Sequence, residues 1–390
     1  MALPVMYNVR NLGQRWKVTL LAVFGIALVV AVFVALLSME AGFRISLRST
    51  GSPLNGIVTQ RGSMSELTSW MQIADANVVA VDPRVARDST GAPLASCEVV
   101  ILTTRPKRAD GQPANVTFRG VSPMAFKVRN GIKVVQGRSF TPGLYEVIVG
   151  KKMAERVTGL DIGSTISVQK KDWKVVGLFD AGGSSFESEI WGDYNAMAPA
   201  VGRNGGCESL TLRLQDPKTL SAFDKEVRAN PRVQLQLDSE PKYYENLAGG
   251  TAQALLGLAA FVSIVMSIGA VFGAMNTMYA IVSQRTREIG TLRALGFSRF
   301  SILFSFVFES VLLALLGGVL GCLLAFLTVN GLTTATGQTN SFSELVFAFQ
   351  ITPPVIAIGI GFAVLMGFVG GLLPALRASR MPITTALREA

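Results

Sequence analysis

Few residues of this chain are of types that catalyse reactions, and their spacing excludes most forms of catalysis. The 390 residues contain no histidine, which excludes Ser-His-Asp and Cys-His triads and zinc sites of the HExxH type. Cys97, Cys207 and Cys322 form no CxxC pair, so a four-thiolate metal site is also excluded. The sequence has no GxSxG nucleophile elbow and no supported pair of carboxylates. We therefore expect a non-catalytic chain that binds no cofactor or metal itself.

Glu309 is the one charged residue in an apolar stretch, residues 300–332. An ionisable side chain inside a membrane span is expensive to bury alone, so it is a functional candidate by default. Two roles are open for this acid: substrate or proton translocation, and pairing with a basic residue or interfacial water. Arg299 lies ten residues earlier, which places Glu309 near the cytoplasmic third of the span and favours pairing.

The segment from Ser283 to Arg299, the docking segment, has a pattern that an ordinary connecting loop does not need. Its apolar residues recur at three-residue spacing: Ile289, Leu292 and Leu295. Gly296 suits a helix stop, and Ser298 can cap the helix that follows. The pattern predicts a short helix across the ends of two membrane helices, with apolar and charged side chains presented to the cytoplasm. We interpret it as a docking site for a partner.

Four apolar stretches could hold these residues in a membrane. The mean hydropathy is +0.42 and only 16% of the residues are charged, against about 25% in soluble chains. About 20 apolar residues cross the hydrocarbon core, and the predicted spans are residues 18–37, 251–282, 300–332 and 353–376. The first span follows basic residues, as in a signal peptide. Its apolar run exceeds the usual ~7–15 residues and no A-x-A site follows, so we expect an uncleaved helix.

Basic residues predict the orientation. The N-terminal arm (residues 1–17), the docking segment and the C-terminal tail (residues 377–390) together hold ten basic and two acidic residues. Lys and Arg accumulate in short cytoplasmic segments, so both termini are predicted to face the cytoplasm. The net charge of +10 thus reflects topology and does not indicate a nucleic-acid partner. The arm is either an amphipathic helix in the headgroup plane or a simple basic flank.

The segment on the opposite side, residues 38–250, is long enough for a domain of its own. Short strands broken by glycine and proline turns, with a few short helices, predict an extracytoplasmic α+β fold in two lobes. A short external loop, residues 333–352, follows the third span. Cys97 and Cys207 share this compartment, where a disulfide can form, but the sequence leaves open whether they are bonded. Cys322 is interpreted as a small buried apolar residue.

Glycine pairs four residues apart occur in three of the predicted spans. They are Gly269/Gly273, Gly317/Gly321 and Gly367/Gly371. Small residues at this spacing allow membrane helices to approach closely. The pairs can serve packing within one subunit or an interface between two.

Three sequence runs carry a resemblance to one protein family. The docking segment contains REIGTLRALG and precedes a Phe-rich helix with Glu309. The tail reads PALRASRMPITTALREA, and residues 137–168 read GRSFTPGLYEVIVGKKMAERVTGLDIGSTISV. With the order of one span, a large external domain and three more spans, these runs resemble the permease subunits of the MacB/FtsX/LolC-type ABC transporters. The resemblance covers essentially the whole chain.

In this family the docking segment is the coupling helix, which seats in a groove of the ATPase. The resemblance therefore implies eight ATPase-contacting residues: Arg287, Glu288, Ile289, Gly290, Leu292, Arg293, Leu295 and Gly296. It also implies a structural or coupling role for Glu309. Span two and its outer extension would form a stalk.

The ATPase itself is not recognisable in these residues. A P-loop requires G-x-x-x-x-G-K-[ST], but at Gly150-Lys151 the first glycine is replaced by Tyr145 and the Ser/Thr by Lys152. The resemblance thus implies a separate cytoplasmic ATPase subunit that binds ATP and Mg²⁺. It also implies two permease copies, identical or paralogous, a bacterial inner membrane with its lipids, and a periplasmic adaptor as a further candidate partner.

Two functions are compatible with this resemblance. The first is export or extraction of a hydrophobic, lipid-linked or peptide substrate, driven by mechanical transmission to the external domain. The second is an FtsX-like signalling subunit that activates an external cell-wall hydrolase without transport. The full-length external domain and the GRSF…EVIVG run favour the first.

Overall fold

The computed structural model describes residues 16–335 and 346–382, and the chain divides into two compact units. The helical unit comprises residues 1–42, 252–332 and 349–390, and the sheet unit comprises residues 43–251 and 333–348. Most of the predicted N-terminal arm (1–17) and parts of the predicted external loop (333–352) and tail (377–390) lie outside the described residues. Their roles stay predictions.

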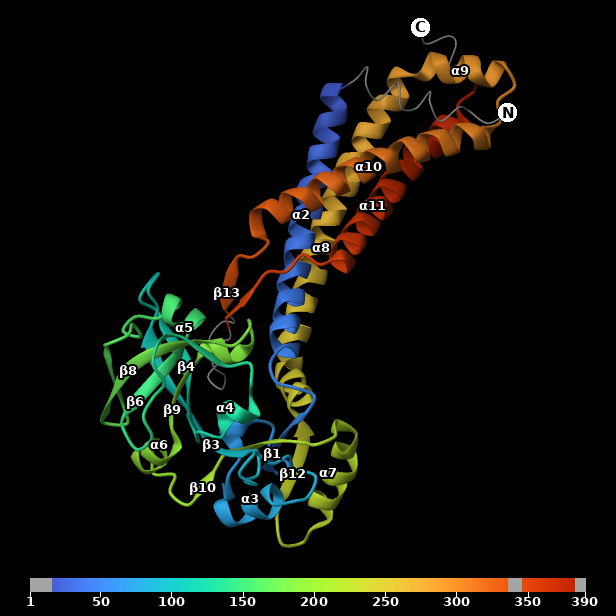
Figure 1. The fold of residues 1–390 in the computed structure, drawn as a ribbon. Helices are drawn as coiled ribbons and strands as arrows, with labels where there is room; N and C mark the ends of the chain where they lie inside the picture. The colour runs from blue at the N-terminus through green and yellow to red at the C-terminus, as the bar shows by residue number, and fades with distance from the viewer. Residues whose placement is uncertain (1–15, 336–345, 383–390) are drawn as a thin grey trace. The chain divides into compact units, whose positions relative to one another are not determined.

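Four long helices contain segments that are long and apolar enough to cross a membrane (Figure 1). They are α2 (Trp16–Arg48), α8 (Glu240–Gln284), α10 (Arg299–Val329) and α11 (Pro353–Arg380). A short helix, α9 (Thr286–Ala294), connects α8 to α10. The predicted number of four membrane helices is therefore confirmed for the described part of the chain.

Helices α2 and α8 are longer than the spans predicted from composition. α2 continues past Leu37 to Arg48, and α8 begins at Glu240, before the predicted start of its span. At a rise of about 1.5 Å per residue, the 45 residues of α8 extend for about 68 Å, more than twice the ~30 Å hydrocarbon core. The charged residues Glu40 and Glu245 lie beyond the apolar runs but still inside the helices, because Glu favours helical backbone as well as most apolar residues do.

Glycines allow close contacts between the helices. Two of the three predicted pairs are packed against neighbouring helices: Gly317/Gly321 in α10 and Gly367/Gly371 in α11. A methyl group at Gly317, for example, would lie 2.9 Å from Cβ of Ile26 in α2. By contrast, no packing atom of the described residues lies within 4 Å of a methyl group placed at Gly269 or Gly273 of α8. The third pair is thus not used for packing against the described residues of this chain.

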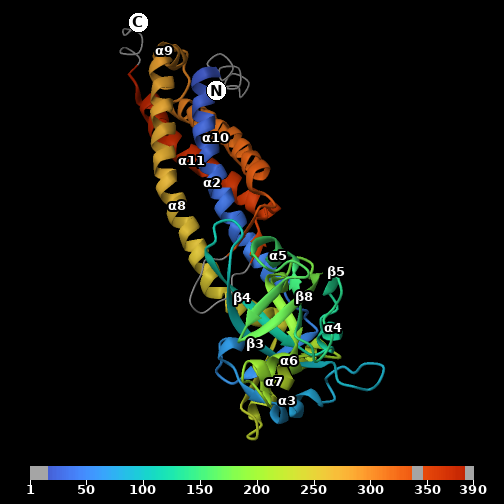
Figure 2. The ribbon, with the colours of Figure 1, turned by 90° about the vertical axis from the view of Figure 1, so that its left-hand side faces the viewer.

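The sheet unit is built on one ten-stranded sheet with the order β12-β1-β11-β3-β4-β9-β6-β8-β5, and β7 pairs with β8. Strands β3, β4, β5 and β8 of this sheet are labelled in Figure 2. The pairs β4–β9 and β6–β8 are parallel and the others are antiparallel. The strands are β1 (Asn55–Gln60), β3 (Ala95–Pro106), β4 (Pro113–Val121), β5 (Lys133–Gly137), β6 (Glu146–Gly150), β7 (Thr165–Val168), β8 (Lys171–Asp180), β9 (Glu189–Asp193), β11 (Ser209–Arg213) and β12 (Leu235–Ser239).

Smaller elements surround this sheet. Two short ladders pair β2 (Met71–Gln72) with β10 (Gly206–Cys207) and β13 (Thr333–Ala335) with β14 (Val346–Ala348). The helices are α3 (Ile73–Ala80), α4 (Ala125–Val128), α5 (Lys151–Arg156), α6 (Tyr194–Ala200) and α7 (Leu220–Ala229). Three single 3₁₀ turns are η1 (Glu66–Thr68), η2 (Ser185–Ser188) and η3 (Pro217–Thr219).

Alternation along the strands sends apolar side chains to one face of the sheet, where they form two cores. The tryptophan core includes Phe118, Met153 and Trp173, and the disulfide core includes Leu212 and Phe223. Strand β3 contributes residues to both. The predicted α+β fold with two lobes is confirmed, with the two lobes sharing one sheet.

A disulfide joins Cys97 of β3 to Cys207 of β10, with the two Cα atoms 5.7 Å apart. The bond fastens the small β2–β10 ladder to the main sheet. The two residues are separated by 110 positions in the sequence, which is why spacing alone left their pairing open. Cys322 is a free thiol buried in α10.

Candidate functional site

The docking segment forms helix α9, and backbone hydrogen bonds define where it ends. The N–H groups of Gly296 and Phe297 donate to carbonyls of the last turn at 3.1 and 3.2 Å, which is a Schellman motif. Gly296 has a φ of +93°, a conformation that glycine adopts without steric strain. Ser298 Oγ then accepts the N–H of Ser301 at 3.1 Å and caps α10. The predicted helix stop and cap are both confirmed.

Helix α9 has a buried face and an accessible face. Ile289 and Gly290 are buried, and Ile289 belongs to an apolar cluster with Ile281, Ile302 and Ala378. The accessible or half-buried members of the predicted contact set are Arg287, Glu288, Leu292, Arg293, Leu295 and Gly296. Ile289 therefore packs in a cluster with residues of α8, α10 and α11, and Gly290 is buried beside it in the chain. ATPase contact by these two residues and by the other six stays a prediction. A helix that packs across other helices must bury one side, and the three-residue spacing did not show which apolar position that would be.

Arg285, directly after α8, links α9 to α10. Its Nη1 donates to Glu309 Oε2 at 2.9 Å and its Nε donates to Glu288 Oε2 at 3.0 Å. Arg285 and Glu309 are 6% and 3% exposed, and the guanidinium carbon lies 5.1 Å from the centre of the Phe306 ring. The structure thus shows Glu309 paired with a base, one of the two roles that the sequence left open. The contact holds the start of α9 against the interior of α10.

The sequence analysis did not single out Arg285. The docking segment contains four arginines, and each satisfies the same preference for positive charge on the cytoplasmic side. The buried acid Glu309 required a basic partner but did not identify it, because the choice depends on how the chain turns between α8 and α9.

The sheet unit contains a second set of buried charges, here called the arginine–glutamate network. Its members are Glu66, Glu98, Arg119, Arg129, Glu189 and Glu240, each no more than 7% exposed. Those in β3, β4 and β9 lie next in sequence to core residues, so strand alternation directs them to the face of the sheet opposite the two cores.

Arg119 contacts three carboxylates of the network. Its Nη1 and Nη2 donate to the two oxygens of Glu66 at 2.7 and 3.0 Å, and its Nε and Nη2 donate to the two oxygens of Glu189 at 2.8 and 2.9 Å. Nη1 also donates to Glu98 Oε2 at 2.9 Å. Paired parallel hydrogen bonds of this kind fix orientation as well as distance.

Arg129 extends the network to the first residue of α8. Its Nε donates to Glu240 Oε1 at 2.7 Å, its Nη1 to Glu98 Oε1 at 2.5 Å and its Nη2 to Thr211 Oγ1 at 2.8 Å. The ring of Phe186 stacks against its guanidinium, 4.7 Å from centre to carbon. Glu98 therefore bridges the two arginines through its two oxygens.

The network holds four carboxylates and two guanidinium groups. Burial raises the pKa of Glu98, and the charges of Arg129 and Arg119 offset only part of that increase. Burial acts in the same direction on Glu66, but Arg119 outweighs it and the pKa of Glu66 is lowered. Among these two carboxyls, Glu98 is the one that accepts a proton more readily.

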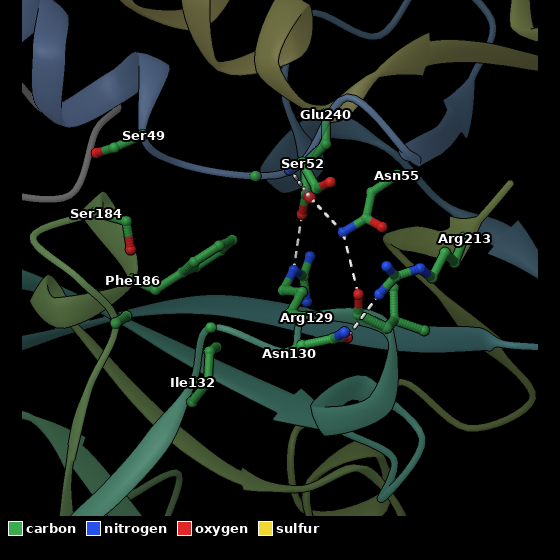
Figure 3. Close-up of a pocket in the computed structure, with 14 residues that line it drawn as sticks. Ser49, Ser52, Asn55, Arg129, Asn130, Ile132, Ser184, Phe186, Arg213 and Glu240 are labelled. Atoms are coloured by element: carbon green, nitrogen blue, oxygen red, sulfur yellow. Dashed lines mark hydrogen bonds and ion pairs between the residues drawn. The ribbon is translucent and has the colours of Figure 1, made fainter. Parts of the chain in front are cut away.

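A cavity of about 270 Å³ lies beside Arg129 and Glu240 (Figure 3). Ser184 Oγ and Asn55 Oδ1, both in residues lining the cavity, have no hydrogen-bond partner within the described part of the chain. Across residues 16–335 and 346–382, no group of three His, Cys, Asp or Glu side chains has the arrangement of a metal site. The sequence analysis missed both network and cavity, since polar residues that alternate with apolar ones in a strand usually face water.

Next to the disulfide, Glu208 is a further buried acid. Arg203 Nη1 lies 2.8 Å from its Oε1, and the N–H of Val100 donates to its Oε2 at 3.3 Å. Burial raises the pKa of Glu208 to about 7. This carboxyl therefore titrates near neutral pH.

Family models match both units of the chain. Residues 19–230 match the MacB-like periplasmic core domain, and residues 260–383 match the FtsX-like permease C-terminal domain. The FtsX-like match includes the whole docking segment, Glu309 and α11.

Named relatives agree with these matches. A macrolide export ATP-binding/permease protein MacB from Bdellovibrio bacteriovorus is 25% identical over 94% of this chain and 59% of its own length. An ABC transporter permease of Bacillus subtilis, YknZ, named as uncharacterized, is 26% identical over 75% of each chain. A pyoverdine export protein, PvdT, from Pseudomonas fluorescens is 26% identical over 95% of this chain and 56% of its own. This chain spans about half the length of the MacB relatives it matches.

Solved structures of external domains also match. The extracellular domain of YknZ from Gram-positive bacteria aligns with 47% of this chain and all of its own length, at 16% identity and a TM-score of 0.36. The periplasmic region of MacB from Actinobacillus actinomycetemcomitans aligns with 52% of this chain and 95% of its own, at 12% identity and a TM-score of 0.36. The core-domain model alone covers more than half of the 390 residues, and with the FtsX-like model beside it the chain belongs to the MacB/FtsX-type family of ABC transporter permeases.

Proposed function

We propose that this chain transmits ATP-driven motion from a cytoplasmic ABC ATPase to an extracytoplasmic domain, in the inner membrane of a bacterium. The observation that carries the proposal is helix α8, which runs without interruption from Glu240 in the arginine–glutamate network to Gln284 at the docking segment. A continuous helix of about 68 Å can pass a displacement from one end to the other, because its backbone hydrogen bonds resist compression.

The accessible face of α9 suits contact with an ATPase. Leu295 is 70% exposed, and the charged side chains of Arg287 and Glu288, two turns earlier along the chain, are exposed as well. An exposed apolar residue beside charges fits the composition of a protein interface better than that of a lipid surface. ATP and Mg²⁺ would bind on the ATPase, because the 390 residues contain no P-loop. The excess of basic residues supports the cytoplasmic placement of this face.

Export is the activity that the relatives support. Two of them are named for export, of macrolides and of pyoverdine. For this chain we propose a hydrophobic, lipid-linked or peptide substrate, moved by the external domain with or without a periplasmic adaptor. A transport assay with the assembled complex separates this activity from FtsX-like signalling, in which ATP hydrolysis activates an external cell-wall hydrolase and no substrate moves.

A second permease copy, identical or paralogous, is proposed to pack against α8. Gly269, Gly273 and Asn276 share one helix face at spacings of four and three residues, and all three are exposed. An amide within an apolar span gains from a hydrogen bond across helices. Gly273→Leu should therefore abolish chemical cross-linking of two copies. Gly25→Leu, on an equally open glycine of α2, should leave cross-linking unchanged.

The docking site is tested by co-expressing the chain with a candidate ABC ATPase subunit from the same organism. Leu295→Asp should abolish co-purification of the ATPase, because it places a charge in the centre of the contact. Val135→Asp is the matched control, since Val135 is 57% exposed but lies in β5 of the sheet unit. Normal assembly and normal stimulation of ATP hydrolysis by Leu295→Asp would overturn the proposed docking site.

A further inference from the structure

The first residue of α8 is held more firmly than its surface neighbours. Glu240 is 0% exposed, and its carboxylate accepts hydrogen bonds from three residues in two separate segments (Figure 3). Arg129 Nε donates to Oε1 at 2.7 Å, and Asn55 Nδ2 and the N–H of Ser52 donate to Oε2 at 2.8 and 3.1 Å. Two residues later, the ammonium group of Lys242 lies in an exposed pair with Asp238 at 3.2 Å.

From Glu240 a continuous path of ion pairs crosses the sheet. Arg129 forms an ion pair with Glu98 of β3, and Glu98 forms a second ion pair with Arg119 of β4. On the opposite face of β3, Cys97 packs against the disulfide core and Val99 lies in the tryptophan core. A displacement of Glu240 therefore reaches the one strand that both lobes share.

Stability alone does not explain why these groups are charged. A buried ion pair is often no more stabilising than apolar residues of the same volume, because two charges lose their hydration. Apolar packing is non-directional and lets surfaces slide, whereas paired hydrogen bonds fix both distance and angle. A contact that must carry a pull in a defined direction is better made from arginine and glutamate. The adjacent cavity of about 270 Å³ leaves room for the two side chains to move.

We propose that the Arg129–Glu240 pair is the mechanical joint through which α8 moves both lobes of the sheet unit. This inference rests on the proposed function, since it needs α8 to move when the ATPase binds ATP. Arg129 and Glu240 are positioning residues and contact no nucleotide. Asn55 and Ser52 complete the joint by holding the second carboxylate oxygen.

Hydrogen exchange of the full chain with its ATPase in lipid nanodiscs tests the joint. Exchange is compared without nucleotide and with ATP plus vanadate, for the unmodified chain, Glu240→Gln and Lys242→Gln. Glu240→Gln keeps the size of the side chain and one acceptor oxygen but removes the charge. Lys242→Gln is the matched control in the same helical turn. If Glu240→Gln does not fold, Arg129→Lys is used, because an ammonium cannot reach all three acceptors of the guanidinium.

In the unmodified chain and in Lys242→Gln, ATP should change exchange in both α8 and strand β3, by about tenfold in β3. In Glu240→Gln the change should persist in α8 and fall below about twofold in β3, with exchange in the nucleotide-free state of both cores unaltered. A merely structural role would instead alter the nucleotide-free exchange and leave the ATP-induced change intact.

The exchange data distinguish failure of the proposed function from failure of the Arg129–Glu240 joint. If ATP changes nothing in the sheet unit of the unmodified chain, the proposed function fails. If the unmodified chain responds and Glu240→Gln responds equally in β3, transmission is intact without the ion pair and the joint is overturned.

Discussion

The helical unit and the sheet unit both contain buried arginine–carboxylate contacts. They differ in how far the paired side chains are exposed to water. In the helical unit one guanidinium, that of Arg285, serves the buried Glu309 and a Glu288 side chain that is 51% exposed. In the sheet unit two guanidinium groups serve four carboxylates, and no member is more than 7% exposed.

This difference assigns the two sets different mechanical roles. The exposed Glu288 is screened by solvent, so the helical set behaves as one buried ion pair that fastens α9 to α10. The arginine–glutamate network is buried from solvent, so the charges of its four carboxylates are balanced only by the two arginines or by a proton. The first set is a single local contact between α9 and α10. The second set connects several strands of the sheet to the start of α8.

The largest effect is expected at the centre of the network. Arg119→Met leaves Glu66 and Glu189 without their paired hydrogen bonds and should lower the free energy of unfolding by about 5 kcal/mol, the upper end for breaking a buried pair. Arg138→Met, which removes an exposed pair with Glu146, should lower it far less, because solvent screens that pair. Thermal unfolding followed by tryptophan fluorescence measures both. Equal losses would show that the network is not more tightly bound than a surface pair.

Substitution of Arg285 in the helical unit should have a smaller effect on stability. Arg285→Met leaves Glu309 buried without its guanidinium and should lower the free energy of unfolding by about 3 kcal/mol. The double variant Arg285→Met/Glu309→Met should lose less than the sum of the two single variants, because it leaves no unpaired charge. The midpoint of thermal unfolding in detergent gives the three values. Strict additivity would mean that the two side chains do not interact.

The disulfide adds a covalent restraint to the sheet unit. Cys97→Ala/Cys207→Ala should lower its free energy of unfolding by about 2 kcal/mol, because the bond restricts the unfolded chain over a separation of 110 residues. A reducing agent should shift the melting temperature of the unmodified chain and not that of the double variant. A shift in the double variant would assign the effect to another group.

The smallest effect is a pH dependence in the sheet unit. Burial raises the pKa of Glu208 from 4.5 to about 7, so the folded state binds more protons than the unfolded state between these values. The free energy of unfolding should therefore fall as the pH rises from about 4.5 to 7, by an amount on the order of 1 kcal/mol once screening near the surface is included. Glu208→Gln should remove this slope in melts at pH 5 and pH 8. An unchanged slope would place the titration elsewhere.

Much of the helical unit could be predicted because a lipid environment requires apolar side chains, so composition alone identifies the membrane helices. An apolar run of about 20 residues has few alternatives to a membrane helix, so four spans follow from hydropathy alone. Hydropathy also identified Glu309 as a candidate, since it is a single charged residue in an apolar run. Gly296 and Ser298 marked the turn after α9 through backbone preferences that act locally.

The sheet unit shows what local patterns could not reveal. Its α+β class follows from short strands and turns, but Glu98 and Arg119 alternate with apolar residues as solvent-facing residues do. They are buried because Phe186 and the first turn of α8 cover that face of the sheet, and those segments come from distant parts of the sequence.

The sequence by itself therefore determined the membrane helices, the class of the external domain and the family, since each depends on composition, periodicity or contiguous motifs. Only the tertiary structure decided which arginine pairs with Glu309, that Ile289 faces inward, that Cys97 meets Cys207 and that six charges form one network. These outcomes depend on contacts between residues far apart in the chain, and the free energy of a buried charge is decided by what surrounds it in space.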